Sequence, residues 1–203
     1  MFANTIPSSP TPKGASANLA VSLQAGYVYR REDLVRLTSA VDRHLSKLVS
    51  VGKIKKLAQG LYYAPKQSNF GPLPPSDEQV VRGFLRDTHF LVFSPSAYNA
   101  VGVGTTQLYN STLVYNHKRH GIFRLGNRQF DFRVKPCFPK KLTVEFLYVD
   151  LLNNLDMLAE DRDAVIEQAR IKLPSFDSAR LIQAIEKFGS ASTRKRLLEW
   201  NGD

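Results

Sequence analysis

The stretch SAVDRHLSKLVSVGKIKKLAQGLYYAPK, from Ser39 to Lys66, decides the predicted fold of the first third of the chain. Apolar residues recur at helical spacing in its first half, and Ser39 and Asp42 form an S-x-x-D pattern typical of a capped helix start. Gly52 follows the last apolar position and is expected to end this helix. Two short runs around the turn at 58–60 then predict a β-hairpin. The stretch therefore predicts a helix followed directly by a hairpin.

Two shorter helices are expected on the N-terminal side of this stretch, one beginning at residue 18 and one over 31–37. Three helices followed by a hairpin give the order of a winged helix-turn-helix, which we assign to residues 18–66. Residues 1–17 are rich in Pro, Ser, Thr and Ala and are predicted to form a flexible tail. Residues 67–75 are rich in Gly and Pro and are predicted to form a linker.

The remaining residues, 76–203, predict a second domain of mixed composition. Apolar residues recur first at the spacing of strands and later at the spacing of helices. The apolar run after residue 142 does not distinguish a strand from a helix. Strands are expected over 89–93, 111–116, 121–125 and 130–134, and later helices over 150–158, 162–172, 176–187 and 192–200. The predicted fold class is therefore α+β: an N-terminal winged helix-turn-helix and a C-terminal mixed α/β domain that ends in helices.

The net charge of the chain is +10, and most of it lies in the first third. Residues 1–66 contain ten Lys and Arg against three Asp and Glu, a balance of +7, which leaves +3 for the rest. Basic charge concentrated in a small domain favours a polyanionic partner.

The outer face of the third helix carries the predicted DNA contacts. Arg43 and Lys47 are four residues apart and share the side opposite the apolar stripe, with His44 at its edge. A helix fits the major groove, where basic side chains donate to guanine O6 and N7, and the small residues Ser39 and Ala40 would let the helix start approach phosphates. We expect bases to be contacted by Ser39, Arg43 and Lys47.

The basic hairpin and the second helix are expected to contact the DNA backbone. Alternating basic and apolar residues at 53–55 suit a strand with one wet face. The full set of predicted DNA-binding residues is Arg30, Arg31, Ser39, Ala40, Arg43, His44, Lys47, Lys53, Lys55, Lys56 and Gln59. Within this set, phosphates are assigned to Arg30, Arg31, Lys53, Lys55 and Lys56.

Catalytic and metal-binding patterns are weak, so we expect no enzyme, no metal and no cofactor. The turn HKRH at 117–120 has two histidines but no carboxylate or cysteine at ligand spacing, and GVGTT at 102–106 lacks the lysine of a P-loop. Cys137 is the only cysteine and is expected to be buried. No apolar run approaches the roughly 18 residues that span a bilayer, and no signal peptide is recognisable, so a cytoplasmic protein without membrane contact is expected.

Two other classes of function remain open at this point. The larger domain could be an enzyme acting on nucleic acid or nucleotides, docked by the winged helix, with Lys118, Arg119 and His120 as its strongest support. Alternatively, the basic face could make the chain an adaptor for an acidic protein.

The stretch from Ser39 to Lys66 resembles the winged-helix segment of AbiEi-like antitoxins, which belong to type IV toxin–antitoxin systems. It follows GYVYRREDL at 26–34 and ends in GLYYAP at 60–65. A second stretch, SPSAYNAVGVGTTQ at 94–107, is similar to the small-residue helix and glycine turn that open the family's C-terminal domain. The helical end around FDSARL at 176–181 is also similar, so the resemblance covers most of residues 20–200.

The resemblance implies a repressor that acts on its own operon through the N-terminal domain and an antitoxin activity that needs the C-terminal domain. The expected DNA partner is a double-stranded operator, built as an inverted repeat and bound by two copies. The expected functional partner is a nucleotidyltransferase-like toxin encoded beside it. Such antitoxins counteract the toxin without necessarily binding it, so a stable complex is not implied.

Overall fold

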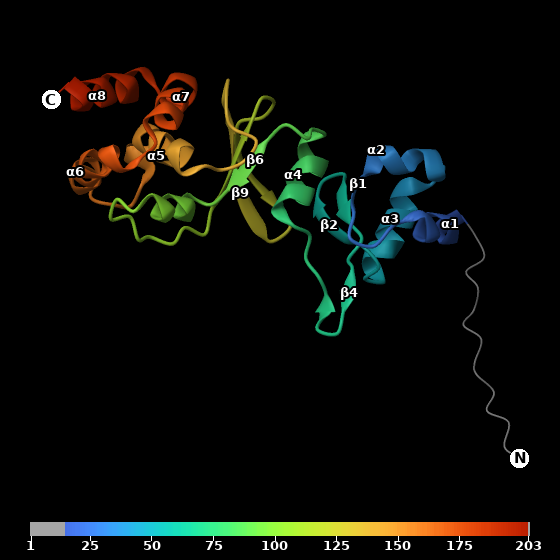
Figure 1. Cartoon of the computed structure of the whole chain (residues 1–203). Coiled ribbons are helices and arrows are strands. Elements are labelled where there is room, and N and C mark those ends of the chain that lie inside the picture. Colours follow the sequence, from blue (N-terminus) through green and yellow to red (C-terminus); the bar gives the residue numbers. More distant parts are fainter. Residues whose placement is uncertain (1–14, 203) are drawn as a thin grey trace, which may run out of the picture. The chain divides into compact units, whose positions relative to one another are not determined.

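The computed structural model of the chain describes residues 15–202, which form an α+β protein with 47% helix and 19% strand (Figure 1). The predicted α+β class is confirmed. The chain divides into two compact units, Met1–Phe84 and Leu85–Asp203, here called the N-terminal and C-terminal units. The predicted tail lies outside the described residues up to residue 14, and its last residues, from Ala15, already belong to the first helix.

The N-terminal unit has a small antiparallel sheet between helices. Its elements are α1 (Ala15–Ser22), β1 (Val28–Arg30), α2 (Arg31–Leu34), the 3-10 helix η1 (Val35–Leu37), α3 (Val41–Ser50), β2 (Lys55–Ala58), β3 (Leu61–Tyr63), β4 (Gln67–Ser68), β5 (Gly71–Pro72) and α4 (Asp77–Leu85). The sheet has the order β1-β3-β2, so the expected hairpin is present and is extended by a short strand between the first two helices.

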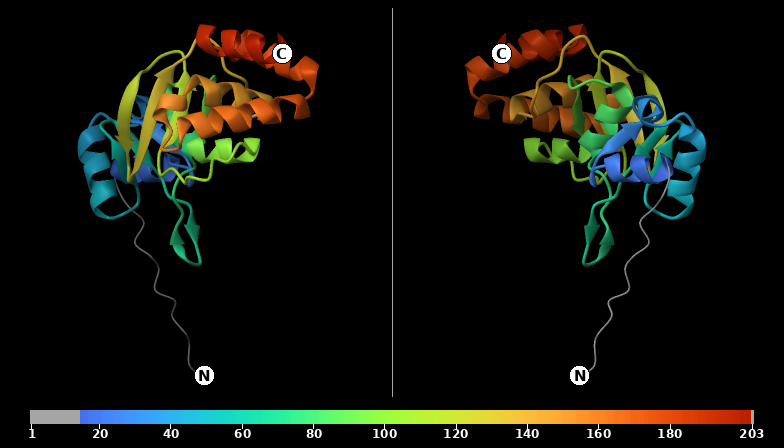
Figure 2. Two further views of the ribbon diagram at one scale, coloured as in Figure 1. Left: turned by 90° about the vertical axis from the view of Figure 1, so that its left-hand side faces the viewer. Right: turned by 90° about the vertical axis from the view of Figure 1, so that its right-hand side faces the viewer.

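The segment expected to be a linker, 67–75, contains a small hairpin of its own. Strands β4 and β5 pair antiparallel, and the hairpin projects from the N-terminal unit as a narrow arm (Figure 1, Figure 2). The boundary between the units falls later, near the end of α4. Helix α4 begins with a capping box, because the Ser76 hydroxyl accepts from the Gln79 N–H at 3.2 Å and the Gln79 side chain accepts from the Ser76 N–H at 3.0 Å.

Val41, Leu45 and Leu48 of the apolar stripe of α3 are buried as expected and lie in the N-terminal core, whereas Val49, expected to be buried with them, is 36% exposed. The core cluster consists of Leu19, Leu34, Val41, Leu45, Leu48, Ile54 and Ala64. The predicted cap of this helix is wrong. The residue before the first turn is Ala40, no side chain caps the helix, and Asp42 binds Arg31 instead of the backbone at Ser39.

The C-terminal unit contains a four-stranded sheet and a layer of helices. Its elements are β6 (Leu91–Phe93), η2 (Pro95–Val101), β7 (Thr112–Asn116), β8 (Gly121–Leu125), β9 (Arg128–Val134), α5 (Val144–Asn153), η3 (Leu155–Met157), α6 (Arg162–Lys172), η4 (Leu173–Ser175), α7 (Ser178–Phe188) and α8 (Ala191–Gly202). The strand order is β6-β7-β9-β8, with β7 and β9 parallel and the other pairs antiparallel. The helices α5–α8 lie on one side of this sheet (Figure 1).

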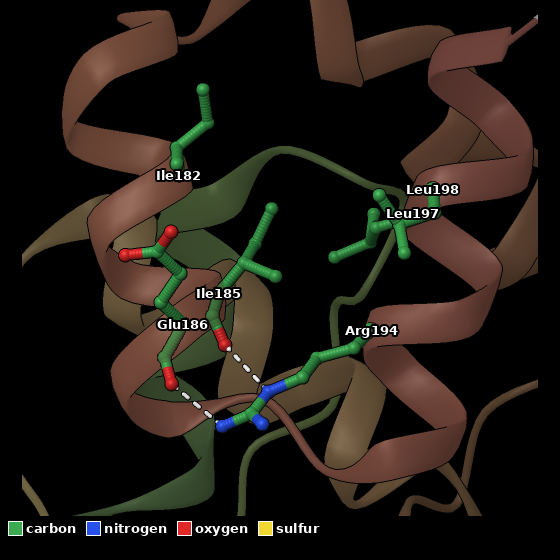
Figure 3. A pocket seen from close by; sticks show the side chains of 6 residues that line it. All are labelled: Ile182, Ile185, Glu186, Arg194, Leu197 and Leu198. Carbon is green, nitrogen blue, oxygen red and sulfur yellow. Dashed lines mark hydrogen bonds between the residues drawn. The ribbon is translucent and has the colours of Figure 1, made fainter.

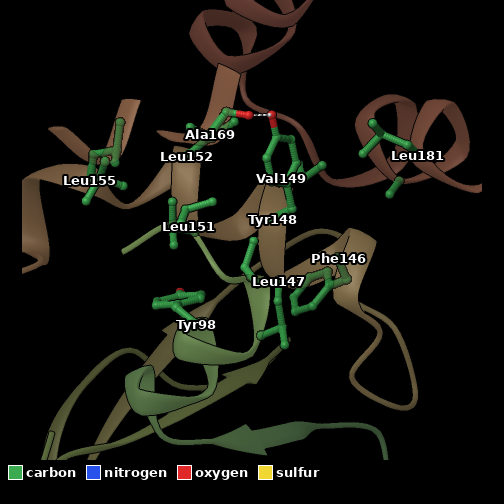
Figure 4. Packing of buried hydrophobic residues seen from close by; sticks show 14 of the residues in the cluster. Tyr98, Phe146, Leu147, Tyr148, Val149, Leu151, Leu152, Leu155, Ala169 and Leu181 are labelled. Carbon is green, nitrogen blue, oxygen red and sulfur yellow. Dashed lines mark hydrogen bonds between the residues drawn. The ribbon is translucent and has the colours of Figure 1, made fainter. Parts of the chain in front are cut away.

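Helix α5 is the central element of the C-terminal core. A helix expected over 150–158 instead begins at Val144, and the ambiguous apolar run is its first half. Every residue from Glu145 to Leu152 is buried, so the helix has no polar face and no helical period that the sequence could reveal. Tyr148 anchors it to α6 by donating its hydroxyl to the Ala169 carbonyl oxygen at 2.9 Å (Figure 4).

Within residues 15–202, none of the helices is both long enough and apolar enough to cross a bilayer.

Candidate nucleic-acid interface

The outer face of α3 presents the two basic residues that the sequence singles out. Arg43 and Lys47 are exposed, whereas Leu45 and Leu48 on the opposite side are 1% and 5% exposed. Among the described residues, neither cationic side chain has a hydrogen-bond or ion-pair partner. Ser39, just before the helix, is exposed as well. These side chains are therefore available to a ligand outside the protein.

Arg31 does not share this availability, because it forms a bidentate ion pair with Asp42. Its Nε and Nη2 atoms lie 2.6 Å from Oδ1 and Oδ2 of the carboxylate. The hydrogen bond from Arg31, reinforced by its charge, lowers the pKa of Asp42, and the same bond raises the pKa of Arg31. The pair thus neutralises the acidic group in the first turn of α3 and also occupies the arginine.

Arg30 has an intramolecular role. Its Nε donates to the Gly83 carbonyl oxygen at 2.8 Å, and its Nη2 donates to the Phe84 carbonyl oxygen. These contacts hold the last turn of α4 against β1. The packing is close, since a Cβ added at Gly83 would lie 2.6 Å from a methyl carbon of Val28. Arg30 is therefore engaged inside the N-terminal unit and is not free to contact a ligand in the way that an exposed cation is.

His44 and Ala40 take part in the junction before α3. His44 Nδ1 lies 2.9 Å from the Thr38 hydroxyl, and the Ala40 N–H donates to the same oxygen at 3.3 Å. Thr38 is only 8% exposed and was missed by the sequence analysis. A threonine two residues before Ala40, the residue that precedes the helix, is the local signal that could have indicated this hydroxyl-to-backbone turn.

The hairpin supplies a second group of cations next to α3. Lys53 and Lys55 are exposed on either side of Ile54, which is 2% exposed, as the alternating pattern predicts. Lys56 is also exposed, because β2 is an edge strand and its register shifts between Lys56 and Ala58. At the turn, Lys56 Nζ donates to the Gln59 side-chain oxygen at 3.0 Å.

The structure thus leaves a set of exposed polar and basic side chains on two adjoining elements of the N-terminal unit. They are Ser39, Arg43, Lys47, Lys53, Lys55, Lys56 and Gln59. Only residues 51–54 separate α3 from β2. Five of the seven side chains carry positive charge, which suits a surface that binds phosphates. We call this set the basic surface.

The basic turn of the C-terminal unit is partly occupied by internal contacts. Lys118 Nζ pairs with Asp87 at 3.0 Å and donates to the Arg86 carbonyl oxygen at 3.2 Å. The Asp87 carboxylate accepts a backbone hydrogen bond from His89 and the contact from Lys118, and these lower its pKa to about 2. Among the described residues, no three His, Cys, Asp or Glu side chains are grouped closely enough to hold a metal ion.

Cys137 is exposed, so the expectation of a buried thiol is wrong. The adjacent Phe138, which has the larger apolar surface, is buried instead.

A buried polar cluster in the C-terminal unit was not predicted. Asp150 on α5 is 2% exposed and accepts hydrogen bonds from the hydroxyls of Tyr98, at 2.8 Å, and Tyr115, at 3.0 and 2.8 Å. Burial raises the pKa of the Asp150 carboxyl, although the hydrogen bonds oppose the shift. Asn154 completes the cluster by donating to the Tyr115 hydroxyl at 3.2 Å. Because these groups satisfy one another inside the core, they form a structural network rather than an open site.

Comparison of the chain with protein-family models, with curated proteins and with solved structures gives no match.

Proposed function

We propose that the N-terminal unit is a winged helix-turn-helix that binds duplex DNA at an operator, with α3 in the major groove. The order of helix, strand, two helices and hairpin, with the sheet order β1-β3-β2, supports this assignment. The observation that carries the proposal is the basic surface, in which Arg43 and Lys47 stand exposed on the outer side of the helix that precedes the hairpin.

In this proposal the residues of the basic surface have two tasks. Arg43, Lys47 and Ser39 contact base edges, where an arginine can donate two hydrogen bonds to one guanine. Lys53, Lys55 and Lys56 contact phosphates, which position the protein without reading sequence. Arg31 joins them only if its pair with Asp42 opens, and Arg30 serves the packing of α4.

We further propose that DNA binding represses the operon that encodes this chain and that the chain is the antitoxin of a type IV system. This part rests on the resemblance of the two sequence stretches to AbiEi-like proteins. Its functional partner is a nucleotidyltransferase-like toxin, the operator is an inverted repeat bound by two copies, and the protein acts in the cytoplasm. A nucleotidyltransferase-like reading frame beside the gene would support this role. Co-expression of that reading frame with the full chain would then test it, because the chain should restore growth that the toxin alone arrests.

The test of DNA binding is a titration of the full chain against its own promoter and against a scrambled duplex over a series of salt concentrations. A repressor binds the promoter tighter by about a thousandfold or more. Equal and steeply salt-dependent binding to both duplexes would show that the basic surface binds DNA without sequence specificity. Failure to bind either duplex, together with salt-resistant binding to an acidic protein, would favour the adaptor.

A further inference from the structure

Two hollows of the C-terminal unit, the first of them mainly apolar, meet along α7. The first lies between α7 and α8, has a volume of about 270 Å³, and is lined by Ile182, Ile185, Glu186, Arg194, Leu197 and Leu198 (Figure 3). The second has a volume of about 580 Å³, shares Ile182 and Ile185 with the first, and extends to Phe176 and Trp200. We call the two together the α7/α8 groove.

Exposed aliphatic side chains line the groove. Leu198 is 72% exposed and Ile182 is 52% exposed, and both line the first hollow. Isolated apolar residues are common on protein surfaces, but exposed aliphatic side chains gathered around a hollow mark an interaction site. Its continuity with the second hollow gives it the elongated form that suits a helix better than a compact ligand.

The groove is held in shape by hydrogen bonds that do not depend on a ligand. Arg194 on α8 donates to the carbonyl oxygens of Ile185, at 3.2 Å, and Glu186, at 2.6 Å, near the end of α7 (Figure 3). Asn153 fixes the turn between the helices by donating to the Phe188 carbonyl oxygen and accepting from the Ser190 N–H, both at 2.8 Å. A partner would therefore meet a preformed surface, which lowers the entropy cost of binding.

The charge around the groove selects among possible occupants. Among the residues that line the groove, Arg170 and Arg194 are basic and Glu186 is acidic. Over residues 170–202 the chain contains seven Lys and Arg against three Asp and Glu. A second copy of the chain would bring the same positive charge against this surface, which opposes association. A nucleic acid would match the charge but not the aliphatic floor.

We propose that the α7/α8 groove binds an acidic amphipathic helix of a partner protein. The apolar side of that helix packs on Ile182 and Leu198, and its carboxylates face the basic residues around the groove. Anchors spaced at i, i+3 or i+4 and i+7 are the usual way in which a helix fills such a groove. This site lies outside the basic surface and does not depend on DNA binding.

The test uses three fluorescein-labelled peptides of about 18 residues, long enough for five helical turns. All carry leucine along one face, and their remaining positions are mainly Glu, Lys or Gln. Fluorescence anisotropy measures their binding to the full chain. We expect the Glu peptide to bind at least about tenfold tighter than the Lys peptide, with the Gln peptide between them.

Two substitutions locate the binding site. Leu198→Asp should weaken the Glu peptide by at least about tenfold, because it places a like charge on the apolar floor. Leu108→Asp is the matched control, since Leu108 is 84% exposed but lies in the segment before β7, and it should leave binding unchanged. Ile182→Asp serves as the second groove variant, and circular dichroism checks that all three fold.

Three results would overturn the proposal. Equal affinities for the Glu and Lys peptides would show that the groove does not select an acidic partner. Absence of binding by all three peptides would show that the groove does not bind an amphipathic helix. A dimer in sedimentation that Leu198→Asp dissociates would assign the groove to a second copy of the chain. Because no DNA is present in these experiments, none of these results bears on the proposed operator binding.

Discussion

The two units place their polar groups in opposite ways. The N-terminal unit keeps most of its cations at the surface, and its helices α1–α3 pack around a cluster of seven buried residues. The C-terminal unit has a cluster of twenty-one buried residues and holds the carboxyl of Asp150 inside it, under two tyrosine hydroxyls. Exposed charge is solvated and accessible to a partner, whereas a satisfied polar network in a core fixes how the elements pack.

The largest expected difference between the units is their response to a cavity. Leu45→Ala in α3 and Leu151→Ala in α5 remove the same atoms from positions that are 1% and 0% exposed, and each should cost about 2–5 kcal/mol. The smaller core loses the larger share of its stability, so Leu45→Ala should unfold the N-terminal unit at lower urea and abolish DNA binding, while most of the helical signal persists.

Urea unfolding followed by circular dichroism, together with a duplex titration, measures this difference. Leu151→Ala is the matched control, since it should destabilise the C-terminal unit and leave DNA binding intact below its own transition. A single unfolding transition that both variants shift equally would show that the two units unfold together. It would contradict the expectation that the N-terminal unit unfolds at lower urea.

The next largest effect concerns the base-reading role proposed for Arg43. Arg43→Ala should reduce the preference for the promoter over a scrambled duplex by about 1–3 kcal/mol, the value of a bidentate contact to a base. Competition titrations at one salt concentration measure this ratio. Arg36→Ala, which removes an exposed arginine from η1, is the control and should change both affinities by the same factor. An equal loss on both duplexes for Arg43→Ala would reduce its role to a phosphate contact.

A smaller effect should appear in the pH dependence of the C-terminal unit. Burial raises the pKa of Asp150 above its ordinary value of 3.8, so the folded chain binds this proton more tightly than the unfolded chain. The resulting stability is complete below pH 3.8 and is lost as the pH rises through the raised pKa. Asp150→Asn does not titrate. The free energy of unfolding of Asp150→Asn minus that of the native chain should therefore increase as the pH rises from 3.8 through the raised pKa. Above the raised pKa this difference should stay constant.

Urea unfolding of both chains at intervals between about pH 3 and pH 8 measures this relative stability. Asp150→Asn also changes the hydrogen bonds of the cluster, which shifts its free energy of unfolding by the same amount at every pH. This constant difference from the native chain is not part of the prediction. Parallel curves throughout the range would mean that Asp150 keeps its ordinary pKa in the folded chain.

The smallest expected effects concern single phosphate contacts. Lys55→Ala should weaken binding to any duplex and reduce the slope of log affinity against log salt by about one unit. Asp42→Asn should act in the opposite direction, because it releases Arg31 from its ion pair, and the slope should steepen by up to about one unit. Salt titrations on the scrambled duplex measure both slopes. A shift of the same sign in the two variants would mean that Arg31 makes no phosphate contact even when Asp42 no longer pairs with it.

The sequence predicts those elements whose signal is local. The amphipathic spacing of α3 gives its buried stripe and its outer face, and α6 has the predicted bounds, 162–172. Strand β1 has three residues and is defined by pairing with β3, more than thirty positions away, so no local pattern marks it. Helix α5 was misplaced because burial on all sides removes its period.

The candidate site divides in the same way. Exposure of Arg43, Lys47 and Lys55 follows from helical and strand periodicity, whereas the partners of Arg30 and Arg31 depend on tertiary contacts. Arg30 binds carbonyl oxygens 53 and 54 positions further along the chain. The capping box predicted at Ser39 and Asp42 does not form, because Asp42 pairs with the charged guanidinium of Arg31 and not with a backbone N–H.

The exposure of Cys137 makes the chain easy to label at one point. It is the only cysteine in the sequence, so a maleimide dye attaches to the C-terminal unit at one position without any engineered substitution. Energy transfer from that dye to an acceptor on a duplex end would follow operator binding in the unaltered protein. The same exposed thiol can also join two chains through an intermolecular disulfide under oxidising conditions, so preparations of the protein call for a reductant.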